Sequence, residues 1–378
     1  MTKNNALHYM ISTNKRTTAL PKNFPTPQEI KNYLDQYVIG QEETKRILSV
    51  AVYNHYKKLK HNIVLRSDDT RLDKSNIILM GPTGSGKTYM VQTIAKMLDV
   101  PYYIQDCTKL TASGYVGSDV EDCVAGLLRA SGYNVKAAER GIVLLDEIDK
   151  IAKRVAGPSI IRDVSGECVQ QSLLKIVEGD LVGVQPEGGR KHPEMSLTYI
   201  DTSNILFIAS GAFVGIEDLV RKRLGQGRAQ IGFDSKTRER ISDDELKDYI
   251  SADDIRDFGF IPEFVGRFPV ITSIARLEKD DLKRILSEPK NSIISQYVEL
   301  LNMDNTLLEF DDGAIDEMAT IAYNLGTGAR ALRNIVEAVV TDIMFDAPNN
   351  IGKRKQVKLV ITRDMVREKT SRKFRFAS

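Results

Sequence analysis

The sequence predicts an α/β fold, with a mostly parallel sheet between helices that carries a phosphate-binding loop, followed by a smaller, mainly α-helical domain. Apolar runs of strand length alternate with helical patterns: SNIILMG, GIVLLDEID and NILFIASGA. A glycine-rich segment, GPTGSGKT, separates the first run from the helical pattern YMVQTIAKMLDV. After about residue 275 the strands give way to amphipathic helical patterns. Apolar strands alternating with helices are typical of a parallel sheet covered on both faces.

The N-terminal part reads as a tail followed by two helices. Residues 1–24 are expected to form a flexible polar tail. Residues 26–59 have a helical pattern in which Thr26 is a cap, Pro27 suits the first helical position and Glu29 completes a capping box. Gly40 is expected to separate the two helices. PYYIQDCT then predicts another strand, and DVEDCVAGLLRAS another helix.

Residues 277–301 and 311–345 each read as a long amphipathic helix, and KQVKLVIT reads as a lone late strand. These patterns predict a large nucleotide-binding domain over residues 25–275 and a small helical domain over residues 276–378.

Composition narrows the class of protein. The 378 residues carry a formal charge of +2, so a global attraction to nucleic acid is not indicated. Cys107, Cys123 and Cys168 form no C-x-x-C pair, which supports neither a zinc ribbon nor a disulfide framework. No apolar run reaches the ~20 residues of a membrane span, and no signal peptide is visible, so we expect a cytoplasmic protein. The basic first residues faintly resemble a transit peptide, but a plain polar tail is favoured.

The segment after the first strand matches the phosphate-binding pattern G-x-x-x-x-G-K-[ST] in full. Its glycines let backbone N–H groups approach phosphate oxygens, Lys87 would reach the β- and γ-phosphates, and Thr88 would offer its hydroxyl to Mg²⁺. The strand and helix on either side argue against a chance match. The expected ATP-binding residues here are Gly81, Pro82, Thr83, Gly84, Ser85, Gly86, Lys87 and Thr88.

Two acids end the run GIVLLDE, at the carboxyl end of a predicted strand, where ligands gather in such sheets. Asp146 is expected to hold Mg²⁺ and Glu147 to polarise the water that attacks the γ-phosphate. The alternative is that this pair caps the next helix. Arg267 and Arg330 are candidates for stabilising the transition state, although each taken alone is more typical of a salt-bridged surface arginine.

Together these residues resemble the AAA+ ATPases, and within them the ClpX family of unfoldases. The resemblance runs from about residue 25 to residue 348. Its motifs are YVIGQ (37–41), VAVYNHYK (50–57), GPTGSGKT (81–88), GYVG (114–117), RGIVLLDEIDK (140–150), PSIIRDVSGE (158–167), GGRKHP (188–193), DTSNILFIASGAF (201–213), IGF (231–233), IPEFVGR (261–267), EPKN (288–291) and GTGAR (326–330).

The resemblance implies roles around the nucleotide. Val38 and Ile39 are similar to the adenine-contacting residues, and Ser210 lies near the first-sensor position. Arg267 is similar to an arginine finger that reaches a neighbour's nucleotide, and Arg330 to the second-sensor arginine. A finger that acts in trans implies a ring, and the resemblance to the ClpX family implies a homohexamer, with ATP and Mg²⁺ as the cofactors.

The resemblance also implies loops that contact polypeptides. Unfolded or tagged protein substrates would be gripped by Tyr115 and Val116 in a first pore loop and by Arg162 and Asp163 in a second. An entrance loop would consist of Arg190, Lys191 and His192. Docking on a ClpP-like peptidase would use Ile231, Gly232 and Phe233.

The sequence departs from the family in two places. Members usually begin with a Cys₄ zinc-binding domain, and residues 1–24 contain no cysteine, so no zinc is expected. Asp234 and Ser235 after IGF are more polar than the family's usual continuation, which puts peptidase docking in doubt. A remodelling ATPase that acts without the peptidase is therefore the alternative. A nucleic-acid motor is disfavoured by the charge and the pore loop, and an HslU-like protein by the absence of a large insertion; neither nucleic acid nor a membrane is an expected partner.

Overall fold

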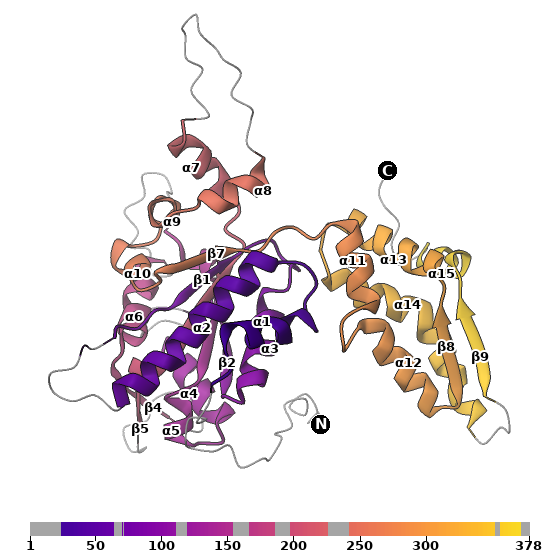
Figure 1. Cartoon of the computed structure of the whole chain (residues 1–378), viewed down its shortest axis with the longest axis horizontal. Coiled ribbons are helices and arrows are strands. Elements are labelled where there is room, and N and C mark those ends of the chain that lie inside the picture. Colours follow the sequence, from indigo (N-terminus) through magenta and orange to yellow (C-terminus); the bar gives the residue numbers. More distant parts are fainter. Residues whose placement is uncertain are drawn as a thin grey trace, which may run out of the picture.

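The computed structural model describes residues 24–63, 70, 72–110, 119–153, 166–185, 197–225, 242–351 and 356–371. Figure 1 shows a larger unit built around a sheet and a smaller, mainly helical unit, joined by the segment that follows β7. In the larger unit the helices are α1 (Pro27–Asp35), α2 (Glu42–Ile63), α3 (Lys87–Leu98), α4 (Asp122–Ala130), α5 (Val135–Ala138), α6 (Glu167–Glu178), α7 (Ile216–Arg223), α8 (Asp243–Leu246), α9 (Ala252–Phe258) and α10 (Pro262–Gly266).

The strands of the larger unit are β1 (Ile77–Met80), β2 (Tyr102–Asp106), β3 (Ile142–Asp146), β4 (Leu181–Val184), β5 (Thr198–Asp201), β6 (Leu206–Gly211) and β7 (Val270–Ser273). Its short 3₁₀ helices are η1 (Cys107–Lys109), η2 (Ile148–Ile151), η3 (Thr202–Asn204) and η4 (Lys247–Tyr249). The smaller unit contains α11 (Lys279–Ser287), α12 (Ile293–Met303), β8 (Thr306–Phe310), α13 (Asp312–Leu325), α14 (Arg330–Asp346), η5 (Ala347–Asn350), β9 (Val357–Ile361) and α15 (Arg363–Thr370).

The central sheet has the strand order β2-β3-β6-β1-β7, and every neighbouring pair is parallel. The carboxyl ends of β3, β6 and β1 therefore lie side by side at one edge. Strands β4 and β5 form a separate antiparallel pair. The predicted parallel sheet is confirmed.

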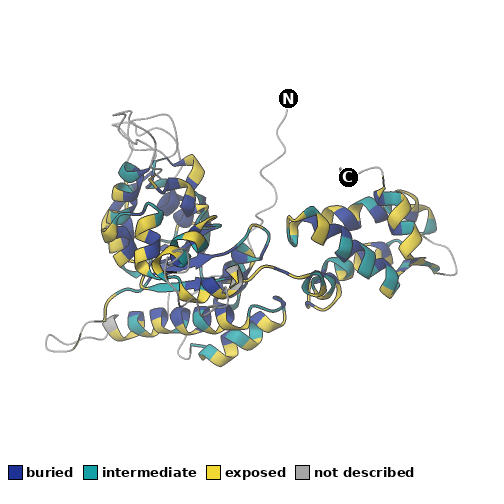
Figure 2. Cartoon of the chain, turned by 90° about the horizontal axis from the view of Figure 1, so that it is seen from above, coloured by how far each residue is buried: buried dark blue, intermediate teal, exposed yellow. Residues whose placement is uncertain are grey.

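Side chains of successive residues on the central strands pack in two different hydrophobic cores, one on each face of the sheet. On β1, Ile77 and Leu79 pack in a cluster with α1, α2 and α3, whereas Ile78 and Met80 pack in a cluster with α4, α6 and α10. Residues along β3 and β6 alternate in the same way. This period of two explains why the strands are apolar throughout: both faces of the sheet are covered. Figure 2 shows the buried residues inside the two units and the exposed residues on the outer faces of the helices.

The start of the larger unit follows the predicted pattern. Thr26 caps α1, its side chain accepts a hydrogen bond from the Glu29 N–H, and the Glu29 carboxylate closes the capping box. Gly40, at a φ of +65°, lies between α1 and α2. The buried ammonium of Lys45 pairs with Asp35 and Glu42, which ties the two helix ends together.

The smaller unit corrects two predictions. Each of the two expected long helices is divided into two, so the region contains four. Pro289 interrupts the first at the turn between α11 and α12, and Gly326 ends α13 at a φ of +66°. The expected lone strand β9 pairs in parallel with β8, so it is not alone. One cluster of buried residues between Leu277 and Val366 forms the core of this unit.

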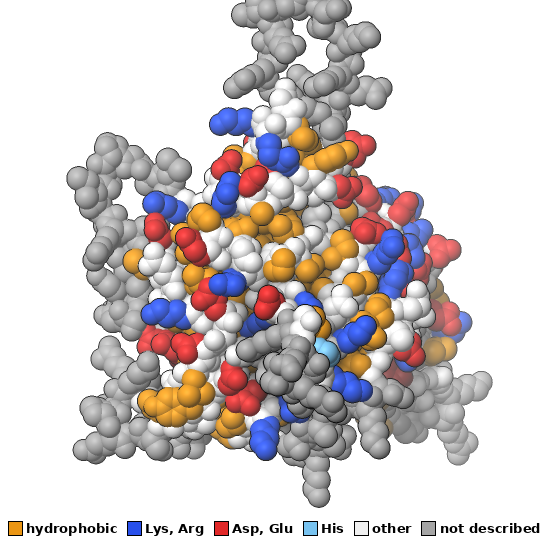
Figure 3. Space-filling view, turned by 60° about the vertical axis from the view of Figure 1, so that its left-hand side comes forward, with side chains coloured by type: hydrophobic (Ala, Val, Ile, Leu, Met, Phe, Trp, Pro, Cys, Tyr) orange, Lys and Arg blue, Asp and Glu red, His pale blue; other side chains and the backbone are white. Residues whose placement is uncertain are grey.

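Charged side chains of both signs are interspersed on the face of the molecule shown in Figure 3. In the described parts of the chain, no helix is long and apolar enough to cross a membrane.

Candidate functional site

The glycine-rich loop connects β1 to α3 at the carboxyl edge of the sheet. Gly81, Gly84 and Gly86 have φ values of +146°, +79° and +98°, a region that side chains other than glycine rarely adopt. Gly86 is the N-cap of α3 and has no side chain to cap it. The first N–H groups of the helix are therefore directed at the loop, as an anion-binding site requires.

Lys87 begins α3 and is 9% exposed. Its Nζ donates hydrogen bonds to the carbonyl oxygens of Gly81, at 2.6 Å, and Pro82, at 2.9 Å. Burial lowers the pKa of the Lys87 ammonium below its usual range, and the nearby carboxylates of Asp146 and Asp149 oppose that shift. The ammonium thus lies folded onto the loop, beside the acids at the end of β3.

Two hydroxyl groups donate to the Asp146 carboxylate at the end of β3. The Thr88 hydroxyl lies 3.1 Å from Oδ2, and the Ser210 hydroxyl, on the neighbouring strand β6, lies 2.6 Å from Oδ1. The parallel order β3-β6-β1 brings these three side chains to one point, although they are far apart in sequence. Ser210 is fully buried, so its hydroxyl fixes the orientation of the carboxylate from inside the sheet.

Glu147 follows in the left-handed region, with a φ of +56°. Such a conformation is strained for a residue other than glycine, and it is common at functional sites. Asp149 accepts a hydrogen bond from the Ala212 N–H at 3.2 Å and fits against Gly211, where a Cβ would lie 2.4 Å from its Oδ1. Asp149 therefore joins the segment after β3 to the end of β6.

The smaller unit forms the other wall of the site. The Ala329 N–H donates to the Gly84 carbonyl at 3.0 Å, directly before Arg330 begins α14. A cleft of about 450 Å³ lies between the two units. It is lined by Thr83, Gly84, Gly86, Lys87, Thr88, Tyr89, Asp146, Glu147, Asp149, Lys150, Gly211, Ala212, Ala329 and Arg330.

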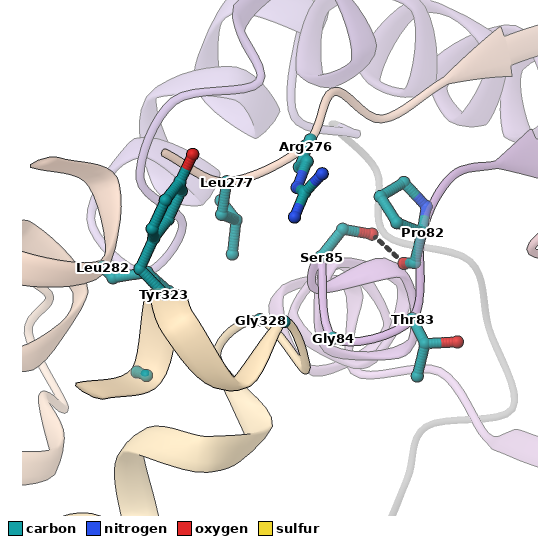
Figure 4. Close-up of a pocket in the computed structure, with 11 residues that line it drawn as sticks. Pro82, Thr83, Gly84, Ser85, Arg276, Leu277, Leu282, Tyr323 and Gly328 are labelled. Carbon is teal, nitrogen blue, oxygen red and sulfur yellow. Dashed lines mark hydrogen bonds between the residues drawn. The ribbon is translucent and has the colours of Figure 1, made fainter. Parts of the chain in front are cut away.

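A smaller cleft lies on the other side of the same loop. The Arg276 side chain lies between Leu277 and the Pro82–Ser85 turn, which is closed by a 2.8 Å bond from the Ser85 hydroxyl to the Pro82 carbonyl (Figure 4). Leu282 and Tyr323 line the far side. Val38 and Ile39, each 7% exposed, lie in the segment between α1 and α2, and neither is among the described residues that line the two clefts.

Arg267 is the C-cap of α10 and lies apart from the described residues that line the cleft. Its guanidinium contacts Oε1 of Glu178, at the end of α6, with Nε at 2.8 Å and an Nη at 2.6 Å. The side chain is 54% exposed, so it remains accessible at the surface.

The substrate and peptidase loops fall outside the part of the chain that the structure describes. This holds for Tyr115, Val116, Arg162, Asp163, Arg190, Lys191, His192, Ile231, Gly232 and Phe233. Their expected roles stay predictions.

Several residues of the site were not singled out in the sequence. Tyr89 directly follows the phosphate-binding motif and Lys150 is the last residue of RGIVLLDEIDK, so their position in the chain could have indicated them. Arg276 and Tyr323 carried no such signal, because only the packing of the two units brings them to the loop.

Known protein families match this chain over both units. A family model described as AAA domain (Cdc48 subfamily) matches residues 72–271, and one described as the C-terminal, D2-small domain of ClpB protein matches residues 277–361. A Treponema denticola protein named "ATP-dependent Clp protease ATP-binding subunit ClpX" is 48% identical over 92% of this chain and 83% of its own length. Proteins of the same name from Borrelia duttonii and Bacteroides thetaiotaomicron are also 48% identical, over 92% and 89% of this chain and 79% and 81% of theirs. The chain therefore belongs to the ClpX family of AAA+ ATPases.

Proposed function

We propose that this chain is an ATP-dependent protein unfoldase and translocase that threads polypeptides through a hexameric pore into a ClpP-like peptidase. As an AAA+ ATPase it hydrolyses ATP, and relatives 48% identical to it are named as the ATP-binding subunit of a Clp protease. The observation that carries the proposal is the cleft, because one space between the two units is lined by the phosphate-binding loop, Asp146, Glu147 and Arg330.

The proposed site holds ATP between a large domain, residues 25–275, and a small domain, residues 276–378. The backbone of Gly81–Gly86 and the N-terminus of α3 would bind the phosphates, and Lys87 would leave the carbonyls of Gly81 and Pro82 for the β- and γ-phosphates. Val38 and Ile39 would contact the base. Arg330 would place positive charge from the small domain on the γ-phosphate, which makes the angle between the domains sensitive to hydrolysis.

Glu147 is proposed as the base of the hydrolytic step. It would accept a proton from the water whose oxygen attacks the γ-phosphorus, while the bond to the bridging oxygen breaks and ADP and inorganic phosphate are released. Arg267 would act on the nucleotide of the neighbouring subunit in a homohexamer of the kind expected for the family. Its exposure at the surface supports action in trans, and so does the fact that it is not among the described residues that line its own cleft.

The residues present suit Mg²⁺, because the Thr88 hydroxyl and the Asp146 carboxylate are oxygen ligands 3.1 Å apart at the edge of the cleft. Mg²⁺ held there would supply positive charge that offsets the negative charge developing on the phosphate during hydrolysis. Ser210 would keep the Asp146 carboxylate directed at that position.

The remaining parts of the proposal rest on the family. Substrate polypeptides would be gripped by Tyr115 and Val116 and selected by the loops that include Arg162, Asp163, Arg190, Lys191 and His192. Ile231, Gly232 and Phe233 would dock on the peptidase. We place the protein in the cytoplasm, which suits the free thiols of its three cysteines.

The first test is degradation of a tagged, folded reporter with ATP and a ClpP-like peptidase, with Glu147→Gln as the matched control. The parent chain should degrade the reporter. The variant should still bind ATP, because its phosphate-binding loop is intact, but its turnover should fall by at least about 100-fold, the scale of a lost general base. Bound ATP and released phosphate are measured in parallel.

Each outcome separates the alternatives. Normal turnover in Glu147→Gln would refute the catalytic assignment. Reporter unfolding without degradation, together with no ATP-dependent binding of the peptidase, would favour the remodelling ATPase. Deletion of Ile231–Phe233 should abolish peptidase binding and leave ATP hydrolysis unchanged.

A further inference from the structure

The side chain of Gln41 pairs with the backbone of a single residue 234 positions away. Its Nε2 donates to the Ala275 carbonyl at 3.0 Å, and its Oε1 accepts from the Ala275 N–H at 2.9 Å. The N–H and the carbonyl of Ala275 are thus both hydrogen-bonded to one side-chain amide. Glutamine and asparagine are the standard side chains that carry an amide N–H donor and a carbonyl acceptor side by side, and asparagine is one methylene shorter.

Ala275 lies where the chain leaves the sheet. Ile274 is still anchored, because its N–H donates to the Met80 carbonyl at 2.8 Å, directly before the phosphate-binding loop. Leu277 already belongs to the core of the smaller unit. The linker between the units is therefore Ala275–Arg276, and the Gln41 amide holds its first residue.

The segment that ends at Gln41 also contacts the smaller unit. At its start, the Gln36 carbonyl accepts a hydrogen bond from the Lys290 N–H at 2.8 Å. A Cβ on Gly40 would lie 3.7 Å from Oδ1 of Asp281 on α11. Residues 36–41, which contain the proposed base-contacting Val38 and Ile39, thus lie against the linker and the smaller unit at both ends.

The backbone of Gln41 is itself unusual. Its φ is +61°, next to Gly40 at +65°, so two consecutive residues adopt the left-handed conformation. Glycine or asparagine is the ordinary choice at such a position. A glutamine there accepts backbone strain while both its Nε2 and its Oε1 bind Ala275, which indicates that the amide is required for more than local folding.

We propose that Gln41 is a positioning residue that couples the base-binding segment 36–41 to the interdomain linker at Ala275. Nucleotide that displaces Val38 and Ile39 moves Gln41, and the paired amide transmits that movement to the linker and so to the angle of the small domain. The inference rests on the proposed function and adds a residue to it.

The test compares three variants with the parent chain. Gln41→Gly removes the amide and relieves the left-handed strain. Gln41→Glu keeps the acceptor for the Ala275 N–H but places a carboxylate oxygen against the Ala275 carbonyl. Gln28→Glu makes the same charge change on α1, where the amide bonds only to Asn32 among the described contacts, and is the matched control.

The decisive readout is the distance between the domains. Dyes on Asn54→Cys, in α2, and Asn349→Cys, in η5, in a Cys168→Ser background report it when one labelled subunit is diluted into unlabelled subunits. ATP binding should change the transfer efficiency in the parent and in Gln28→Glu. In Gln41→Gly the change should fall to less than about one third, and the ATP consumed per unfolded reporter should rise by about five-fold or more, the lower range of coupling between sites. The change in transfer efficiency in Gln41→Glu should lie between the changes in the parent and in Gln41→Gly.

The melting temperature shows whether Gln41 positions the linker or merely stabilises the fold. The melting temperature of Gln41→Gly should equal or exceed that of the parent, because glycine accepts the left-handed conformation. A parent-like dye response in Gln41→Gly overturns the inference, and so does a loss of response that merely follows a loss of stability. If the parent itself neither binds nor hydrolyses ATP, the proposed function fails and the inference fails with it.

Discussion

Asp146 shows how much of the site depends on single side chains from different helices and strands. Its carboxylate is held by hydroxyl groups from α3 and β6, so its direction is set before any ligand arrives. The acid itself could be predicted, because it ends an apolar strand. Its partner Ser210 was only weakly indicated, since a buried serine at a strand end has no distinctive spacing. The pairing of Arg267 with Glu178 carried no signal, because it depends on how α10 packs on α6.

His55 is a residue whose protonation should affect stability rather than catalysis. It is 5% exposed, and its Nε2 lies 3.2 Å from the Asn204 carbonyl. Burial, with a smaller contribution from Lys74, lowers its pKa from 6.5 to about 3. The folded protein therefore keeps His55 neutral, while the unfolded chain binds a proton as the pH falls below 6.5. His55 therefore makes its full contribution to the free energy of unfolding above pH 6.5, and this contribution declines as the pH falls toward 3.

We predict that His55→Gln reduces this loss of stability in acid. Between about pH 7.5 and about pH 5, the protonation of His55 in the unfolded chain should cost about 2 kcal/mol. Glutamine also donates to the Asn204 carbonyl but does not titrate. The free energy of unfolding, measured with urea at both pH values, should therefore fall by about 2 kcal/mol less in the variant than in the parent. An equal fall in both proteins would contradict the prediction.

Gln170 joins three elements behind the cleft. It is fully buried on α6, and its Nε2 donates to the Ile151 carbonyl at 2.8 Å and to the Gly259 carbonyl at 3.2 Å. Its Oε1 accepts from the Ile261 N–H at 2.8 Å. The amide thus links η2, which follows Glu147, to the turn that leads into α10 and Arg267. The segment after Glu147 and the turn that leads to Arg267 therefore meet at this one side chain.

We predict that Gln170→Leu lowers the free energy of unfolding by about 2–4 kcal/mol, because buried backbone groups lose their partner without gaining water. Gln296→Leu is the matched control. Its half-buried amide bonds to the Asn291 carbonyl and to Arg333 near the surface of α12, so the cost should stay below about 1 kcal/mol. Denaturation with urea measures both, and equal costs would show that Gln170 is not a structural junction.

The elements differ in how far the sequence predicted them. The predicted strands that became β1, β3 and β6 are buried runs with acids or glycines at their ends, and such runs indicate their own boundaries. β7 is four residues long, half-buried and at the edge of the sheet, so it lacked that pattern. The partner of β9 was missed because β8, TLLEF, directly precedes a helix start and reads as part of a helical stretch.

At the scale of the whole molecule, the two units meet through glycines. A Cβ on Gly84 would lie 2.2 Å from the Thr327 carbonyl oxygen, and one on Gly328 would lie 2.8 Å from the Gly84 carbonyl oxygen. The phosphate-binding loop and the segment before Arg330 therefore touch backbone to backbone. The sequence predicted both motifs and a mainly helical part after the sheet, but not that the loop itself is the contact. A glycine required for its φ and a glycine required for close packing look alike in a sequence.

Gly328→Ala, a substitution in the small domain, should consequently weaken ATP binding in the cleft. Gly326→Ala, two residues away, is the control. Both glycines are left-handed, at +61° and +66°, so both variants carry a similar backbone cost of about 1–2 kcal/mol. Only at Gly328 does the new methyl meet the loop, since no atom lies within 4 Å of a Cβ on Gly326. Gly328→Ala should push Arg330 away from the cleft and raise the KM for ATP by about ten-fold, equivalent to about 1.4 kcal/mol of lost binding, whereas Gly326→Ala should leave it within about two-fold of the parent. Steady-state ATP hydrolysis measures both. Equal KM values in the two variants would show that this backbone contact is incidental to nucleotide binding.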